Sequence, residues 1–373
     1  MKLNLDIDNF LAEYWQQKPL LIRNAIPDFV APIDADELAG LAMESEVESR
    51  IIETLPDNWG LYHGPFKEAD YRRDKPWTLL VQAVDHYVQE VAGLLKLVDF
   101  IPNWRVDDVM VSYAVDGGSV GPHYDNYDVF LLQGKGKRHW QLGQMCDSHS
   151  ALLPHPDLRI LDHFNCVDEY TLEPGDILYI PPGIAHWGIA QGECTTFSLG
   201  FRAPRINDML SRWADELLEN LDPEQFYSDI GQSAVNLSGE IRGEDFDRAK
   251  TQLAAALEQK MGQHWFGELV TEPRYSPEVT EEDIDAGGQL LRETDATVLL
   301  QPSAKLAWQQ SDTGIAVFAN GEYLPVSEAI RPAIIQLCKD RKLSGAGLAQ
   351  FRASPGGIEL LEELLSLGCI SIE

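Results

Sequence analysis

Hydrophobic and polar positions follow two different patterns along the chain. Between Trp104 and Arg202, short apolar runs alternate with Gly, Pro and Asp, whereas after Pro204 apolar residues recur at three- and four-residue spacings. Short runs bounded by turn residues predict strands, and closely spaced strands predict a sandwich or small barrel. Apolar residues three and four apart predict amphipathic helices. We therefore expect a β barrel followed by a helical region.

The strands predicted for the barrel all lie between residues 109 and 201. They are Val109–Val115, Tyr127–Gln133, Arg138–Leu142, Ile177–Ile180 and Thr195–Phe201. Ahead of them, the pattern predicts a short helix from Phe10 that ends near Pro19, then an apolar β run at Leu20–Ile22. A second helix is expected over Asp34–Met43.

The C-terminal part predicts helices around one hairpin. Helical periodicity covers Met209–Leu221, Phe246–Met261, Ser327–Asp340 and Gly357–Leu367. Thr271–Asp285 contains two prolines and a cluster of acids, which indicates a linker. Asn320-Gly321 lies between two β runs, a pattern that favours a type I′ hairpin. A small unit of hairpin and helices is typical of a winged-helix fold.

Composition restricts the class of protein and the kind of metal site. A chain of 373 residues, 44% hydrophobic and 24% charged, predicts two or three globular units. It has no apolar run of about 18 residues, and Asp6 and Asp8 stand where a signal peptide would be basic or apolar, so we expect a cytoplasmic protein without a membrane segment. The five cysteines form no C-x-x-C pair. Any metal must therefore be held by His and carboxylate side chains.

The charge balance bears on the partner. A formal net charge of −31 repels phosphate backbones, so no direct binding of nucleic acid is expected. Residues 276–373 contain 7 Lys and Arg against 15 Asp and Glu, so we interpret the winged-helix-like unit as a docking or structural module. The acidity suits a basic protein partner, although solubility alone accounts for it equally well.

A candidate metal site combines two segments. His123 and Asp125 are two residues apart, so on an extended segment both project to one face. This pair is weak by itself. A third ligand, His186, follows a buried strand and the rigid turn Pro181-Pro182-Gly183. Two His and one carboxylate form a facial triad, which leaves three adjacent positions on Fe(II) for a bidentate co-substrate and O₂.

With these residues, the chain resembles the JmjC/cupin 2-oxoglutarate oxygenases. The resemblance rests on His123-Tyr-Asp125, on Glu173-Pro-Gly-Asp-Ile-Leu-Tyr-Ile-Pro-Pro-Gly-Ile-Ala-His186, on Arg138 and on the segment from Trp15 to Ile22. Within that family, the order of barrel, helical region and winged-helix-like unit is similar to the ribosomal oxygenases. The resemblance covers essentially the whole chain.

This resemblance implies a mainly β fold with α elements. The barrel would be a double-stranded β-helix of the jelly-roll, cupin and JmjC type, followed by a helical dimerisation region and a small winged-helix-like domain. We expect the catalytic domain over 1–204, the helical region over 205–270, the linker over 271–285 and the C-terminal domain over 286–373. The apolar faces of the helices between Asn207 and Phe266 also predict a homodimer, and an intramolecular bundle is the alternative.

The resemblance implies Fe(II), 2-oxoglutarate and O₂ as cofactor and co-substrates. It places the anchor for the distal carboxylate of 2-oxoglutarate fifteen residues after the first His ligand, at Arg138. Arginine presents a bidentate fork that lysine lacks. Ser112, on the preceding strand, is a candidate hydroxyl partner of that carboxylate, and a strand serine satisfied elsewhere is the alternative.

The bacterial ribosomal oxygenases hydroxylate an arginine of ribosomal protein L16, at C-3. The resemblance therefore implies a protein hydroxylase that yields succinate and CO₂, with L16 as a basic protein substrate. Asp116, in Val115-Asp-Gly-Gly118, is a candidate for holding the cationic side chain, although Asp-Gly is also ordinary turn chemistry.

Three alternatives remain at the level of sequence. The oxygenase could act on a different protein or on a small molecule. The barrel could be a metal-binding cupin without oxygenase activity, but such cupins usually have a fourth ligand, where this chain has Tyr124, Asn126 and Tyr127. A winged-helix regulator with the barrel as ligand switch is the third, and the acidic C-terminal part argues against it.

Overall fold

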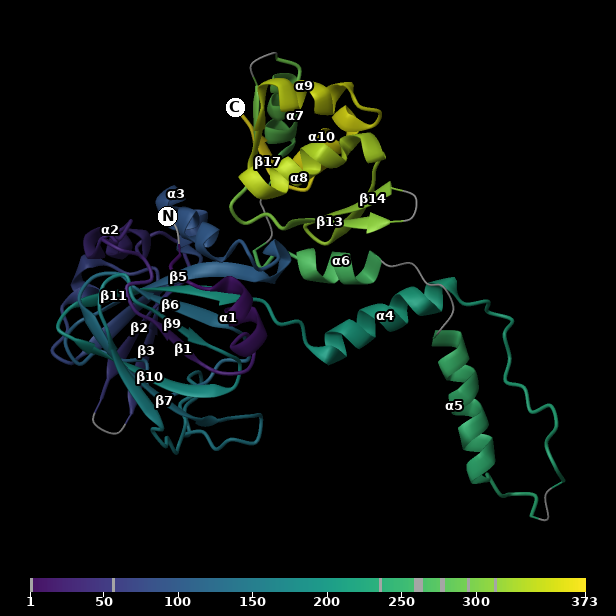
Figure 1. The fold of residues 1–373 in the computed structure, drawn as a ribbon, viewed down its shortest axis with the longest axis horizontal. Coiled ribbons are helices and arrows are strands. Elements are labelled where there is room, and N and C mark those ends of the chain that lie inside the picture. The colour runs from purple at the N-terminus through teal and green to yellow at the C-terminus, as the bar shows by residue number, and fades with distance from the viewer. Residues whose placement is uncertain are drawn as a thin grey trace. The chain divides into compact units, whose positions relative to one another are not determined.

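The computed structural model describes residues 3–55, 58–234, 237–257, 264–275, 279–293, 296–311 and 314–373. The chain forms two compact units (Figure 1). One contains residues 1–203 with 301–303, and the other contains 204–300 with 304–373. Distinct roles for 205–270, 271–285 and 286–373 stay predictions.

The N-terminal unit is built mainly of strands. Its elements are α1 Ile7–Glu13, β1 Leu20–Ile22, α2 Ala35–Leu41, β2 Ser49–Thr54, β3 Trp59–His63, η1 Glu68–Tyr71, β4 Trp77–Val81, η2 Val84–His86, α3 Gln89–Ala92, η3 Gly93–Val98, η4 Asn103–Arg105, β5 Val106–Ala114, β6 Val129–Gln133, β7 Lys137–Met145, β8 Asp168–Leu172, β9 Ile177–Ile180, β10 Ile184–Gln191 and β11 Cys194–Phe201.

Two antiparallel sheets form the predicted β barrel. The larger has the order β1-β9-β6-β11-β5-β4-β2-β3, and the smaller has the order β10-β7-β8. An apolar cluster with contributions from both sheets includes Leu131 and Leu178 of the larger sheet and Trp140 and Leu142 of the smaller one. Burial of such side chains from two sheets closes the barrel around an apolar cluster.

The other face of the large sheet is covered by the N-terminal helices and loops. Phe10 of α1 lies fully buried against Tyr179 of β9 and Phe130 of β6. Asp6 caps α1 by accepting a hydrogen bond from the Asn9 N–H. The helix therefore begins before the predicted Phe10, at Ile7, and it ends at Glu13, well before Pro19.

The sequence pattern located part of this unit well. β1 and β9 have the predicted bounds, and the other predicted strands are present with ends shifted by a few residues. β2, β3 and β4 were not predicted. Polar residues such as Arg50 and Glu53 interrupt the apolar pattern of β2, and its strand pairing with β3 and β4 is a tertiary effect.

The C-terminal unit begins with helices and ends in a small α/β unit. Its elements are α4 Ile206–Asn220, α5 Gly243–Leu257, α6 His264–Thr271, α7 Glu281–Leu290, β12 Thr297–Leu300, β13 Leu306–Ser311, β14 Gly314–Ala319, β15 Glu322–Pro325, η5 Glu328–Ile330, α8 Arg331–Asp340, β16 Lys342–Ser344, α9 Gly345–Ala353, α10 Gly357–Ser366 and β17 Ile370–Ile372. Two three-stranded sheets, β16-β12-β17 and β13-β14-β15, carry its strands.

The predicted hairpin is confirmed. Asn320 and Gly321 join β14 to β15 with φ of 46° and 90°, the positive values that a type I′ turn requires. α7 begins inside the segment 271–285 that was expected to be a linker, because Thr280 and Asp283 form a capping box. Residues 258–261 of the predicted helix Phe246–Met261 lie outside the described residues.

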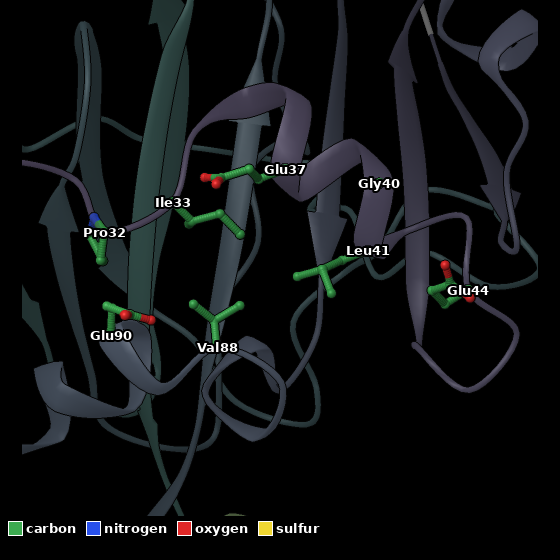
Figure 2. Close-up of a pocket in the computed structure, with 8 residues that line it drawn as sticks. All are labelled: Pro32, Ile33, Glu37, Gly40, Leu41, Glu44, Val88 and Glu90. Atoms are coloured by element: carbon green, nitrogen blue, oxygen red, sulfur yellow. The ribbon is translucent and has the colours of Figure 1, made fainter.

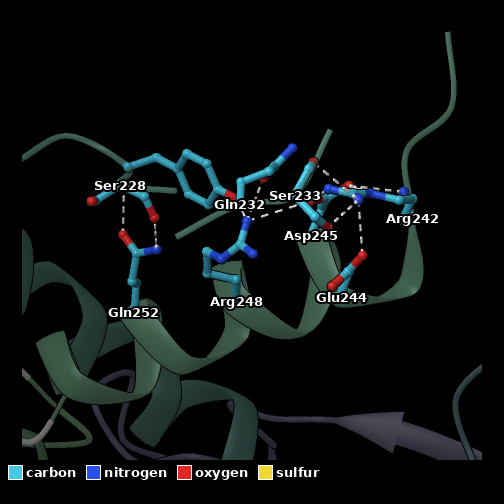
Figure 3. Close-up of polar contacts among 9 residues, drawn as sticks. Ser228, Gln232, Ser233, Arg242, Glu244, Asp245, Arg248 and Gln252 are labelled. Atoms are coloured by element: carbon cyan, nitrogen blue, oxygen red, sulfur yellow. Dashed lines mark hydrogen bonds and ion pairs between the residues drawn. The ribbon is translucent and has the colours of Figure 1, made fainter. Parts of the chain in front are cut away.

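The segment before α5 folds back onto that helix (Figure 3). Gln252 exchanges two hydrogen bonds with the backbone of Ser228, and Arg248 donates to Gln232. Arg242 pairs with Asp245 near the start of α5. These contacts hold an irregular stretch against one face of the helix.

The described residues include five free cysteines. No helix within the described ranges is both long and apolar enough to cross a membrane.

Candidate active site

The backbone brings the two predicted histidines together. His123 and His186 form an isolated antiparallel bridge, in which each N–H donates to the other residue's carbonyl, at 3.0 and 2.8 Å. Gly183, with φ of +82°, donates its N–H to the Asp125 carbonyl at 2.7 Å. The Pro181-Pro182-Gly183 turn is thereby attached to the strand-like segment that carries His123 and Asp125.

Hydrogen bonds also fix the orientation of both imidazoles. Nδ1 of His123 lies 2.9 Å from the Gly121 carbonyl, and Nδ1 of His186 lies 3.0 Å from the Ile184 carbonyl. A carbonyl can only accept, so each Nδ1 carries a proton, and in a neutral imidazole with this tautomer Nε2 presents the lone pair. Such a bond is the usual support of a metal-binding histidine.

One ligand atom from each of His123, Asp125 and His186 lies within 4.8 Å of the other two. Nε2 of His186 is 3.6 Å from a carboxylate oxygen of Asp125. Burial, together with the neighbouring His123, lowers the pKa of His186 to about 4, so this imidazole is neutral at physiological pH. A neutral imidazole is the form that binds a metal.

Arg138 is a buried cation without an anionic partner in the described part of the chain. Its guanidinium Nη1 donates to Ser112 Oγ at 3.2 Å, so the two residues predicted as a pair are in contact. Nε and Nη2 are buried and have no protein partner among the described residues. An unpaired buried charge is costly. The two groups therefore fit a site for a carboxylate ligand.

The candidate Asp116 and a second aspartate close to the triad in sequence, Asp128, both have structural surroundings. Asp116 is exposed in a turn, and its carboxylate accepts the Gly192 N–H at 2.7 Å. Asp128 is fully buried, and it accepts hydrogen bonds from Gln16, Tyr179 and Arg105. Asp128 thus links the N-terminal segment to the barrel.

Two residues near the site had no role in the sequence prediction. Tyr127 is one: the neighbouring Asp125 carboxylate and a hydrogen bond to that carboxylate raise the pKa of the Tyr127 phenol, although the residue is 42% exposed. Trp140 is the other: its ring centroid lies 5.9 Å from that of His186 and 5.8 Å from the Arg138 guanidinium. The sequence could have indicated Trp140, because it lies two residues after Arg138 and alternate residues of a strand share a face.

A separate recess of about 530 Å³ lies against α2 (Figure 2). Its walls combine Ile33, Leu41 and Val88 with three glutamates, Glu37, Glu44 and Glu90. α2 packs on β4 and β5, and Val109 and Val111 belong to the same apolar cluster. Ser112 follows Val111 on β5, so its side chain lies on the opposite face of the sheet. The recess therefore lies on the outer face of the sheet and has no residue of the triad.

Comparisons with known proteins agree with this geometry. The family model for the JmjC domain matches residues 93–209, and the family model for the ROXA-like winged helix matches residues 249–370. The ribosomal protein uL16 3-hydroxylase of Escherichia coli is 34% identical over 379 residues, which cover 98% of both chains. This chain belongs to the ribosomal oxygenase family.

Further members extend the comparison. A probable ribosomal oxygenase of Haemophilus influenzae is 33% identical and covers 89% of this chain and 85% of its own. The crystal structure of E. coli YcfD superposes with a TM-score of 0.84 at 34% identity, over 100% of this chain and 99% of that one. Another YcfD structure, in complex with cobalt and 2-oxoglutarate, has a TM-score of 0.80 at 33% identity and the same coverage.

These matches confirm the fold that was expected for a ribosomal oxygenase. The JmjC match spans β5 to β11, and with them the triad, Ser112 and Arg138. The winged-helix match includes the hairpin at Asn320-Gly321.

Proposed function

We propose that this ribosomal oxygenase is an Fe(II)- and 2-oxoglutarate-dependent protein hydroxylase, with His123, Asp125 and His186 as the metal ligands. The observation that carries the proposal is the combination of the triad with a buried arginine, Arg138, whose Nε and Nη2 have no partner among the described residues. A metal triad alone would suit any cupin. The anion site adds a place for the carboxylate of a co-substrate such as an oxo acid.

Bound Fe(II) and 2-oxoglutarate would supply the oxidation of a substrate C–H bond by O₂, with succinate and CO₂ as further products. The two imidazoles and the Asp125 carboxylate would occupy one face of the metal. Arg138 would bind the distal carboxylate of the co-substrate, and Ser112 would hold the guanidinium and share that carboxylate. The apolar cluster of the barrel interior would exclude water.

The proposed substrate is a basic ribosomal protein, and specifically an arginine of L16 that is hydroxylated at C-3. The E. coli relative carries the name uL16 3-hydroxylase. The net charge of −31 favours association with a basic protein over nucleic acid. Asp116 is exposed and could contact the cationic side chain, although its carboxylate already accepts one turn N–H. With such a substrate, we expect the enzyme to act in the cytoplasm.

We also propose a homodimer through the helical region. Ile206, Leu210 and Leu218 of α4 are exposed at four- and eight-residue spacings, which place them on one helix face. Phe246, Leu253 and Leu257 form a similar exposed apolar face on α5. Two exposed apolar helix faces within one region suit burial against a second copy.

The function is tested by incubating the iron-loaded protein with 2-oxoglutarate, O₂ and recombinant L16. Mass spectrometry should detect an increase of about 16 mass units on one arginine, with one succinate formed for each hydroxylation. His186→Ala should abolish both products, whereas His163→Ala, which changes an exposed histidine outside the triad, should not. Turnover on another peptide with no shift of L16 would overturn the substrate assignment but retain the oxygenase.

A further inference from the structure

Trp140 occupies the space between the two halves of the candidate site. In the pairing of β7 with β10, Arg138 lies opposite Ala190, Trp140 opposite Gly188, and Leu142 opposite His186. Arg138 and Trp140 share one strand face, so the indole stands in the row between the guanidinium and the imidazole of His186. A molecule that reaches from the metal ligands to Arg138 must pass this ring.

Gly188 provides the room for the indole. A Cβ at position 188 would lie 2.8 Å from Cη2 and Cζ3 of Trp140 and 3.0 Å from Cε3, closer than real side chains pack. The six-membered ring thus lies directly on the backbone of β10. Three ring atoms at nearly equal distance place the face of the six-membered ring on Gly188, so the indole N–H, which lies in the ring plane, does not point at this backbone.

The indole N–H has no hydrogen-bond partner among the described residues, although Trp140 is only 4% exposed. Buried tryptophans usually satisfy this donor. The rest of the ring packs in the apolar cluster of the barrel interior. Trp140 therefore packs as a core residue, but its indole N–H has no partner among the described residues. The same is true of Arg138 Nε and Nη2.

From this arrangement, we propose that Trp140 is a specificity-determining residue for the 2-oxo acid. Its N–H donates to an oxygen of the bound acid, and its ring, fixed by Gly188, limits the carbon chain between metal and Arg138 to the length of 2-oxoglutarate. The inference rests on the proposed function and names a residue that the triad and the anion anchor leave out.

Calorimetry on the Mn(II)-loaded full chain tests this proposal. It measures the equilibrium binding of 2-oxoglutarate and of 2-oxoadipate, an acid that is one methylene longer. Trp140→Phe removes the indole N–H and replaces the two fused rings by a single smaller ring. We expect 2-oxoglutarate to bind roughly three- to tenfold more weakly, the loss of one hydrogen bond. The preference for 2-oxoglutarate over 2-oxoadipate should fall at the same time.

Gly188→Ala tests the same contact from the other strand. The added methyl group should push the indole off β10 and narrow the site, so 2-oxoadipate binding should weaken more than 2-oxoglutarate binding. The two variants thus change the preference in opposite directions, which a merely structural effect would not do. Trp308→Phe, in the C-terminal unit, is the control for loss of an indole and should leave both affinities unchanged.

Unchanged preference in both variants would overturn the role of Trp140 while the wild-type protein still binds 2-oxoglutarate. Failure of the wild-type Mn(II) form to bind 2-oxoglutarate would overturn the proposed function and this inference with it. Melting temperatures identify any variant that fails to fold, in which case the other variant decides.

Discussion

At the scale of single residues, two aspartates three positions apart have opposite surroundings. Asp125 is partly exposed beside His186, whereas Asp128 is fully buried and accepts hydrogen bonds from Gln16, Tyr179 and Arg105. The chain bends at Asn126 and Tyr127 between the two aspartates, so their side chains enter different surroundings. The same residue type is therefore a proposed metal ligand at one position and a buried ion-pair partner at the other.

We expect Asp125→Ala and Asp128→Ala to separate these roles. Asp125→Ala should abolish Mn(II) binding in calorimetry with little change in the melting temperature of the metal-free protein. Asp128→Ala leaves Arg105 without its buried partner, so the free energy of unfolding should fall by about 3–5 kcal/mol. The roles would be wrong if Asp128→Ala lost the metal at unchanged stability.

Arg138 should show a conflict between stability and ligand binding. Arg138→Met removes a buried cation with unsatisfied N–H groups, so the melting temperature without ligand should rise. Binding of 2-oxoglutarate to the Mn(II) form should weaken roughly ten- to a hundredfold, the range of a charge-assisted hydrogen bond. Lys137→Met, which removes an exposed cation paired with Glu173, is the control and should change neither quantity appreciably.

At the scale of elements, local signals determined some segments and tertiary pairing determined others. The bounds of β1 and β9 and the turn at Asn320-Gly321 follow from short apolar runs and from turn chemistry. β2 to β4 depend on pairing between strands with mixed polarity, and α9 was not predicted. Such elements obtain their stability from neighbours that a sequence window does not contain.

The adjacent glycines of α7 test how packing acts on an element. A Cβ at Gly287 would lie 2.7 Å from Leu365 of α10, whereas nothing lies within 4 Å of a Cβ at Gly288. Gly288→Ala should stabilise by up to about 1 kcal/mol through helix propensity. Gly287→Ala should destabilise by roughly 1–3 kcal/mol through overpacking. Scanning calorimetry of both variants should give shifts of opposite sign, and equal shifts would contradict the α7–α10 contact.

At the scale of the whole molecule, the helical region carries apolar side chains that the single chain leaves exposed. Leu253 of α5 is 65% exposed and lies on the same face as Phe246. An acid at this face would repel a second copy and lose apolar burial. The proposed dimer contact thus depends on a few side chains.

Leu253→Glu should shift the protein from dimer to monomer in sedimentation velocity at several concentrations. Thr251→Glu adds the same charge at an exposed polar position of α5 and should leave the dimer intact. A wild-type chain that sediments as a monomer at every concentration would contradict the dimer. In that case the exposed faces would belong to contacts within one chain.

The sequence by itself determined the residue types, the spacings and the rigid Pro-Pro-Gly turn that define the site. It predicted His123, Asp125, His186, Arg138 and Ser112 as site residues, because local backbone geometry and the family motifs depend on neighbouring residues. The tertiary structure decided which of the remaining polar residues are structural, as with Asp128, and which side chains stand between distant ligands, as with Trp140. Those outcomes depend on strand register and on the space beside Gly188, which arise only when segments far apart in sequence pack together.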